Sequence, residues 1–193
     1  DSHLHLTNYV QKGPTVKEFL EVMGDNVGRS TLFGIPLQQQ WSYMNSGEDA
    51  PKYYLDTDAP LYYYSFTDAY IADEFNSLTE DQKKRIEPMI TGFNPADMYA
   101  SEHIKRVLLT FPGVFSGIGE FTIHKEFVSS KVAGEIASLR NPALDTVLAT
   151  AGEIGLVVIL HNDINKPYPK SYTQNYLKDV WELFRRHPEA TII

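Results

Sequence analysis

The chain has 193 residues, of which 42% are apolar and none is cysteine, and its formal charge is −8. This is the size of one domain with a substantial core. Without cysteine there are no disulfides or thiolate sites, so a metal ion would need His, Asp or Glu. The acidic balance, with no basic stripe, argues against general nucleic-acid binding. No apolar run reaches the roughly 18 residues that span a bilayer, and no signal-peptide pattern opens the chain.

The first elements predict a strand, a helix and a second strand. Asp1 to Leu6 alternate so that His3 and His5 face one side of a strand while the leucines pack behind. Helical spacing predicts a helix over 16–23 that ends at Gly24, and an apolar run predicts a strand over 31–37. Strand, helix and strand is how an α/β fold begins.

A loop insertion is predicted around residues 38–60, where the periodic pattern weakens. This segment carries Trp41, and long loops of α/β enzymes often line substrate sites. We therefore take Trp41 as a candidate on the substrate side. An aromatic surface loop that packs only on itself explains the segment equally well.

The middle of the chain predicts a third strand and two helices. The strand covers 61–66, which is rich in tyrosine and phenylalanine. Thr79 and Gln82 form a capping-box pattern that predicts a helix from residue 80 through Ile90. A second helix is predicted over 98–108.

The last third of the chain continues the alternation. A fourth strand is predicted over 114–121 and a helix over 142–151 that closes at Gly155. The run 156–161 is apolar until its last residue, as in a parallel strand that is covered on both faces. A helix over 176–184 and a sixth strand over 190–193 follow.

Six strands separated by helical or loop segments favour an α/β fold with a parallel sheet. An open Rossmann-type sheet and a (β/α)8 barrel both begin in this way. No Gly-x-Gly-x-x-Gly pattern follows the first strand and no phosphate-loop pattern is present, so nucleotide binding has little support.

Four side chains could meet around one metal ion. Glu120 and His161 come at the predicted ends of the fourth and fifth strands, and His3 and His5 lie on the first. In a barrel these strand ends share one mouth, and imidazoles with a carboxylate suit zinc or a similar divalent ion. Each residue also has a plainer reading: His3 and His5 as strand histidines without a ligand, Glu120 as a helix cap and His161 as a core histidine.

Other polar residues are weaker candidates. His124, four positions after Glu120, could orient a substrate, although a solvent-facing loop histidine is the simpler reading. Asp163 is expected to organise the turn after the fifth strand, and Asp1 to accept a hydrogen bond from a metal ligand or simply to start its strand. His103 and His187 lie in predicted helical segments and are read as structural.

Three motifs resemble those of the amidohydrolase superfamily, in particular amidohydrolase-related proteins and TatD-like hydrolases. They are Asp1-Ser2-His3-Leu4-His5-Leu6, Gly117-Ile118-Gly119-Glu120-Phe121 and Ile159-Leu160-His161-Asn162-Asp163. The resemblance implies a (β/α)8 TIM-barrel fold with about its first six strands in this chain. It also implies one domain over 1–193 and four metal ligands, His3, His5, Glu120 and His161.

Family members also carry a His after strand six and an Asp after strand eight that moves the proton of the attacking water. This sequence stops at Ile193, so the catalytic Asp is expected beyond it and the chain is interpreted as the N-terminal part of a barrel. Whether this part is active by itself is left open by the sequence.

The expected function is a metal-dependent hydrolase, with one or two divalent ions, most simply zinc, that cleaves a C–N or C–O bond of an amide, lactone or ester. The alternatives are a metal-dependent nonoxidative decarboxylase of a small carboxylic acid and, from another class, a non-catalytic α/β binding or scaffold protein. A TatD-like nuclease ranks lower because the chain is acidic. We expect a small-molecule substrate, no nucleic-acid or membrane partner, a fold compatible with a homo-oligomer, and a cytoplasmic location, with the periplasm equally consistent with the lack of cysteine.

Overall fold

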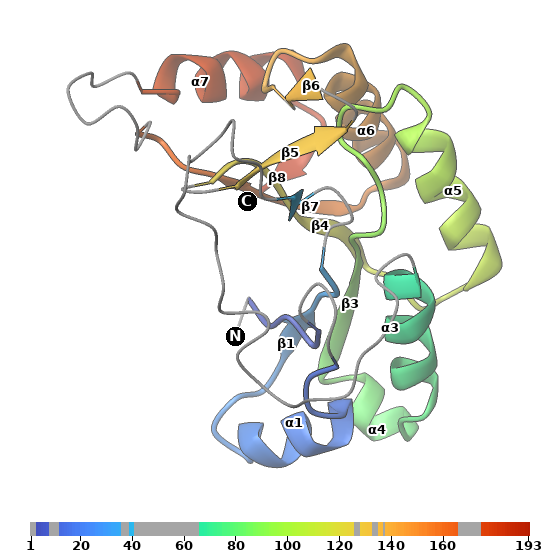
Figure 1. Ribbon diagram of the computed structural model, residues 1–193. Coiled ribbons are helices and arrows are strands. Elements are labelled where there is room, and N and C mark those ends of the chain that lie inside the picture. Colours follow the sequence, from blue (N-terminus) through green and yellow to red (C-terminus); the bar gives the residue numbers. More distant parts are fainter. Residues whose placement is uncertain are drawn as a thin grey trace.

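The computed structural model describes residues 3–7, 12–35, 39–40, 66–125, 128–132, 135–136, 138–165 and 175–193 (Figure 1). Its centre is a five-strand parallel sheet. The strand order is β1 (Ser30–Leu32), β3 (Ile86–Ile90), β4 (Gly117–Lys125), β7 (Val157–Asn162) and β8 (Thr191–Ile192). The α/β class is therefore confirmed, and this sequential strand order is compatible with part of a (β/α) fold.

The N-terminal segment lies beside the residues that follow β1. His5 forms a parallel bridge with Phe33, whose N–H donates to Leu4 O at 2.8 Å. The Leu6 N–H donates in turn to Phe33 O, also at 2.8 Å. Residues 3–7 thus take the place that the sequence predicts for a first strand, next to the second, while Asp1 and Ser2 lie outside the described residues.

Four predicted helices are confirmed: α1 (Val16–Met23), α5 (Ala100–Thr110), α6 (Pro142–Ile154) and α7 (Leu177–Arg186). Their ends follow from local chemistry, since Thr15 and Glu18 form a capping box and Gly155 closes α6 in the left-handed conformation. Figure 1 shows the helices on the outer side of the curved row of strands. Within the described chain, none of the helices is long and apolar enough to cross a bilayer.

The predicted helix from residue 80 to Ile90 is wrong. The capping box at Thr79 is present, but α4 (Glu80–Lys83) has only four residues and is followed by β3. Pro88 lies inside this segment, and a proline there would remove a hydrogen bond and clash within a helix. Because most of β3 is buried, its apolar residues Ile86, Met89 and Ile90 fit a covered parallel strand as well as a helix face.

Helix α3 (Thr67–Asn76) was not expected from the sequence. Its N-cap is Phe66, the last residue of the strand predicted over 61–66, and the rest of that prediction lies outside the described residues. The buried positions Thr67, Asp68, Ile71, Ala72 and Phe75 repeat at helical spacing. This spacing was the available signal, and the two polar residues at its start obscured it.

Strand β4 begins later and runs further than the predicted strand over 114–121. Its last residues pair antiparallel with β5 (Val128–Val132), which pairs in turn with β6 (Glu135–Ile136) and β2 (Gln39–Gln40). Part of the predicted loop around 38–60 is therefore a strand, and the other residues of that loop lie outside the described ranges. Glu120 lies within β4 and not at its end, which corrects the predicted position.

The core lies between the sheet and the outer helices. Fully buried side chains of β4 and β7 belong to the same apolar cluster as those of α6. They are Ile118, Phe121, Ile123 and Val158 from the strands, and Leu144, Val147, Leu148 and Ala151 from the helix. At about 25 cal/mol per Å² of buried apolar surface, this cluster is the main source of stability for the strands that carry the polar site.

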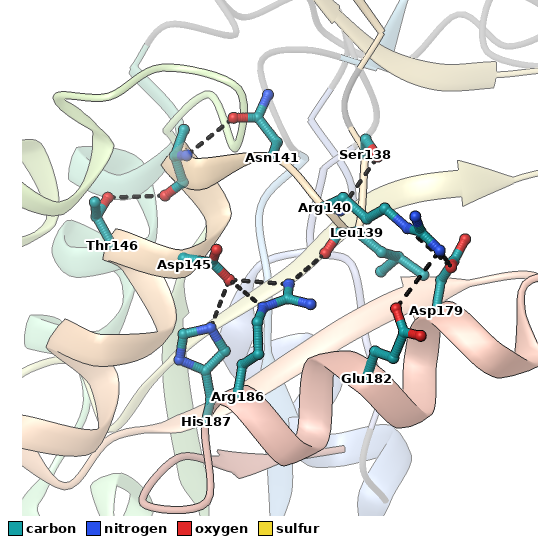
Figure 2. A network of polar contacts seen from close by, with 11 residues as sticks. Ser138, Leu139, Arg140, Asn141, Asp145, Thr146, Asp179, Glu182, Arg186 and His187 are labelled. Atoms are coloured by element: carbon teal, nitrogen blue, oxygen red, sulfur yellow. Dashed lines mark hydrogen bonds and ion pairs between the residues drawn. The ribbon is translucent and has the colours of Figure 1, made fainter.

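A polar network fastens α7 to α6 (Figure 2). Asp145 of α6 accepts hydrogen bonds from Arg186 Nη2 at 3.0 Å and from His187 Nε2 at 2.6 Å. Arg140, just before α6, pairs with Asp179 of α7 at 2.5 Å. His187 thus caps α7 and joins the two helices, as expected for a structural histidine.

Asp68 joins the start of α3 to the end of β3. This buried carboxylate accepts hydrogen bonds from the N–H groups of Thr91 at 2.9 Å and Gly92 at 3.0 Å. Burial raises the pKa of Asp68 from 3.8 to about 6, although these bonds act in the opposite direction. Between these two values the folded chain binds more protons than the unfolded chain, so the contribution of Asp68 to stability falls as pH rises from about 4 to about 6.

We expect Asp68→Asn to remove this part of the pH dependence, because an amide does not titrate. In the parent protein, the change in pKa corresponds to a fall of about 3 kcal/mol in the free energy of unfolding across this pH window. Urea unfolding at several pH values measures it. Asp73→Asn, an exposed position of the same helix, is the control and should keep the parent slope. Equal slopes for Asp68→Asn and the parent protein would contradict the assignment.

Candidate metal centre

His3 and His5 lie together on a buried aromatic ring. Their ring centroids are 5.0 Å apart, and each centroid is 5.4 Å from that of Phe33, which is fully buried. The side chain of His3 is 50% exposed and that of His5 is 24% exposed. The pair therefore has an apolar floor and an open side that solvent can reach.

Glu120 is the buried centre of the cluster, with 4% of its surface exposed. Its Oε2 lies 2.7 Å from His5 Nε2 and 3.1 Å from His3 Nε2. Its other oxygen, Oε1, lies 2.5 Å from His161 Nδ1. One carboxylate therefore contacts the three histidines that the sequence predicts as metal ligands.

Glu120 reaches this position because of the pairing between β4 and β7. The register shifts between Gly119 and Phe121, so Glu120 lies at an irregularity with no direct partner on β7. Gly119 has a φ of 120°, and a Cβ there would overlap the Ile159 backbone. Glycine at this position allows the two strands to approach closely, and the β-bulge directs the carboxylate to the histidines.

The electrostatics of the cluster favour an ionised carboxylate. Burial by itself raises the pKa of Glu120. The hydrogen bonds with His161 and His5 and the nearby charges of His5 and His3 together outweigh burial, so the pKa of Glu120 lies well below its ordinary value. Glu120 is therefore negatively charged at neutral pH, and this buried charge needs a positive partner.

The hydrogen bonds of His5 indicate that this positive partner lies between His5 Nε2 and Glu120. Its Nδ1 lies 2.7 Å from the carbonyl oxygen of Gly34, which can only accept, so Nδ1 carries a proton. In a neutral imidazole, Nε2 then presents a lone pair to the Glu120 oxygen 2.7 Å away. Two lone pairs facing each other require a cation, which is either a second proton on His5 or a metal ion.

The ligand atoms of His3, His5 and Glu120 form a group that could hold a metal ion. One ligand atom from each residue lies within 4.8 Å of the other two. Two imidazole nitrogens and a carboxylate oxygen are ligands that zinc takes at about 2.0–2.2 Å. Three protein ligands would leave a fourth position of a tetrahedral ion for water or substrate. The half-exposed side chain of His3 leaves this side of the group open to solvent.

His161 approaches the centre from the far side of Glu120. Its Nδ1 contacts Glu120, and its Nε2 lies 3.3 Å from Asp163 Oδ1. It is not among the three residues whose ligand atoms lie within 4.8 Å of one another, so its role as a ligand stays a prediction. Asp163, expected only to organise a turn, is also a partner of His161.

The two substrate-side candidates have different outcomes. His124 lies within β4 and not in a loop, and its ring stacks on Tyr176 with centroids 4.0 Å apart and planes 7° apart. Its carbonyl oxygen accepts a hydrogen bond from the Asp163 N–H at 2.8 Å. His124 is thus near the His161 side of the site, whereas Trp41 lies outside the described residues.

Gly34 was missed from the sequence, because its contribution is a backbone carbonyl. The Gly34-Ile35 pair after β1 was read only as part of a buried strand, and any residue type supplies a carbonyl oxygen. The signal was its position, since the end of β1 must lie beside a predicted first strand that carries His5.

Comparison with protein-family models found none that matches the chain, and no curated protein sequence matches it significantly.

Proposed function

We propose that this chain provides the metal centre of a metal-dependent hydrolase that cleaves a C–N or C–O bond of a small molecule such as an amide, lactone or ester. The observation that carries the proposal is the buried carboxyl group of Glu120 with His3 Nε2 and His5 Nε2 on one of its oxygens. The amidohydrolase resemblance and the sequential parallel sheet support it. The sheet would then be the first part of a (β/α)8 barrel.

His3, His5 and Glu120 would hold the ion, with zinc as the proposed metal and His161 as a further ligand from β7. A bound divalent ion supplies Lewis acidity and lowers the pKa of a coordinated water toward neutrality. The chain's own part is to fix the ligands: Gly34 O holds the proton on His5 Nδ1, which leaves Nε2 free to bind.

The test is metal binding by the purified chain. We expect one or two zinc ions per chain by elemental analysis, and a fall in melting temperature when a chelator removes them, because an ion that binds only the folded state stabilises it. His5→Gln should weaken zinc binding by about 100-fold or more, since even the loss of a residue that only supports a ligand costs 10–100-fold.

His187→Gln is the matched control, because His187 lies in the α6–α7 network and not at the site. It should lower the melting temperature slightly and leave the zinc content unchanged. A parent chain that binds no zinc, cobalt or manganese and whose melting ignores chelator would overturn the hydrolase proposal in favour of a non-catalytic scaffold.

A further inference from the structure

Thr67, the first residue of α3, is fully buried against the segment that follows β1. Its Oγ1 accepts a hydrogen bond from the Ile35 N–H at 3.3 Å. The same hydroxyl lies against Gly34, where a Cβ would overlap it and would also approach Thr91 Oγ1 to 3.2 Å. The backbone of Gly34 and Ile35 is therefore held between the start of α3 and the end of β3.

This backbone is the part of the fold that orients His5. The Gly34 carbonyl oxygen accepts a hydrogen bond from His5 Nδ1–H, with 2.7 Å between the two heavy atoms, and His5 Nε2 faces Glu120. A rotation of the Gly34 carbonyl would weaken the bond to Nδ1. It would also release the imidazole to turn away from Glu120.

Thr67 is itself fixed by its neighbour. Asp68 accepts the N–H groups of Thr91 and Gly92, so the first turn of α3 is anchored to the end of β3. Thr67 then reaches the end of β1 from a rigid position. The Thr67-Asp68 pair thus joins the ends of two adjacent parallel strands beside the candidate metal centre.

We propose that Thr67 is a positioning residue for His5, acting through the backbone of Gly34 and Ile35 to hold the hydrogen bond from His5 Nδ1 to Gly34 O and so keep Nε2 toward Glu120. The effect of Thr67 on zinc affinity rests on the proposed function. Its effect on the orientation of His5 in the metal-free protein stands without the proposed function.

The experiment compares Thr67→Val, which removes the hydroxyl and puts a methyl group against Gly34, with Thr67→Ser, which keeps the hydroxyl. Zinc affinity is measured by competition with a chromogenic chelator, and the hydrogen bond from His5 Nδ1–H to Gly34 O by the ¹H–¹⁵N NMR signal of that N–H and its exchange with solvent in the metal-free protein. We expect Thr67→Val to weaken zinc binding by about 10-fold or more and to speed the exchange of the His5 Nδ1 proton with solvent, because its bond to Gly34 O is weakened. Thr67→Ser should keep both quantities near the parent values.

Thr150→Val is the matched control. Thr150 is a buried threonine of α6, outside the segments that carry His3, His5 and Glu120, so this variant should change neither readout. If Thr67→Val does not fold, Thr67→Ala removes the hydroxyl without adding a methyl group at Gly34. Unchanged solvent exchange of the His5 Nδ1 proton in the folded variant overturns the positioning role. A parent protein that binds no zinc overturns the proposed function instead.

Discussion

Glu120→Gln should abolish tight zinc binding while leaving a folded protein. The substitution keeps the size of the side chain but replaces the buried negative charge by an amide, which has one oxygen and one N–H2 group for three histidines. We expect zinc affinity to fall by about 100-fold or more, since even a residue that only orients a ligand is worth 10–100-fold. Isothermal titration with zinc at neutral pH measures this change.

The charge of Glu120 is the reason for this large effect. Because hydrogen bonds to His161 and His5 hold the pKa of Glu120 below its ordinary value despite burial, the carboxylate is ionised at the pH of the titration. A divalent ion therefore enters a site that already carries a negative charge.

Glu87→Gln is the control for Glu120→Gln. Glu87 is a half-buried residue of β3 that pairs with Arg29 at 3.2 Å, away from the histidines. The Glu87→Gln variant should bind zinc with the affinity of the parent protein. Zinc binding by Glu120→Gln at parent affinity would show that the ion, if bound, is held elsewhere.

Helices α1, α5, α6 and α7 could be predicted from the sequence because their signals are local. The capping box at Thr15 and Glu18 and the left-handed Gly155 act within a few residues of the helix ends. The same local pattern misled at Thr79, where the capping box opens only one turn. The spacing of Ile86, Met89 and Ile90 fits the face of a helix, whereas Pro88 between them argues against a helix because it would break one.

The site could be predicted as a set of residues but not as an arrangement. His3 and His5 alternate on one short segment, so their proximity follows from two-residue periodicity. The contact between Glu120 and His161 depends on the register between β4 and β7 and on the irregularity at Gly119. Register and bulges arise from pairing between distant segments, which no single stretch of sequence displays.

The hydrogen bonds that support the ligands were the least visible part of the site. Gly34 contributes a carbonyl oxygen, and Thr67 acts on it from a helix that the sequence pattern did not predict. Neither residue type has a chemical signature for metal binding. Such partners can be found only once the fold has placed α3 beside the end of β1.

Gly119→Ala tests the link between strand pairing and the site. Gly119 has a φ of 120°, which residues with a side chain rarely adopt, and a Cβ would overlap the Ile159 backbone of β7. We expect the free energy of unfolding to fall by about 3 kcal/mol or more, from roughly 1–3 kcal/mol of backbone strain and a similar cost of overpacking. Zinc affinity should fall as well, because β4 must move away from β7 and carry Glu120 with it.

Urea unfolding and zinc titration of Gly119→Ala measure the two effects, and Gly28→Ala is the matched control. Gly28 precedes β1, and a Cβ there would meet no atom within 4 Å, so this variant should change neither quantity. If Gly119→Ala were as stable as Gly28→Ala, the close approach of β4 and β7 would be wrong. If Gly119→Ala were destabilised but bound zinc at parent affinity, the position of Glu120 would not depend on this strand pairing. The ligand set drawn from the N-terminal segment and β4 would then have to be revised.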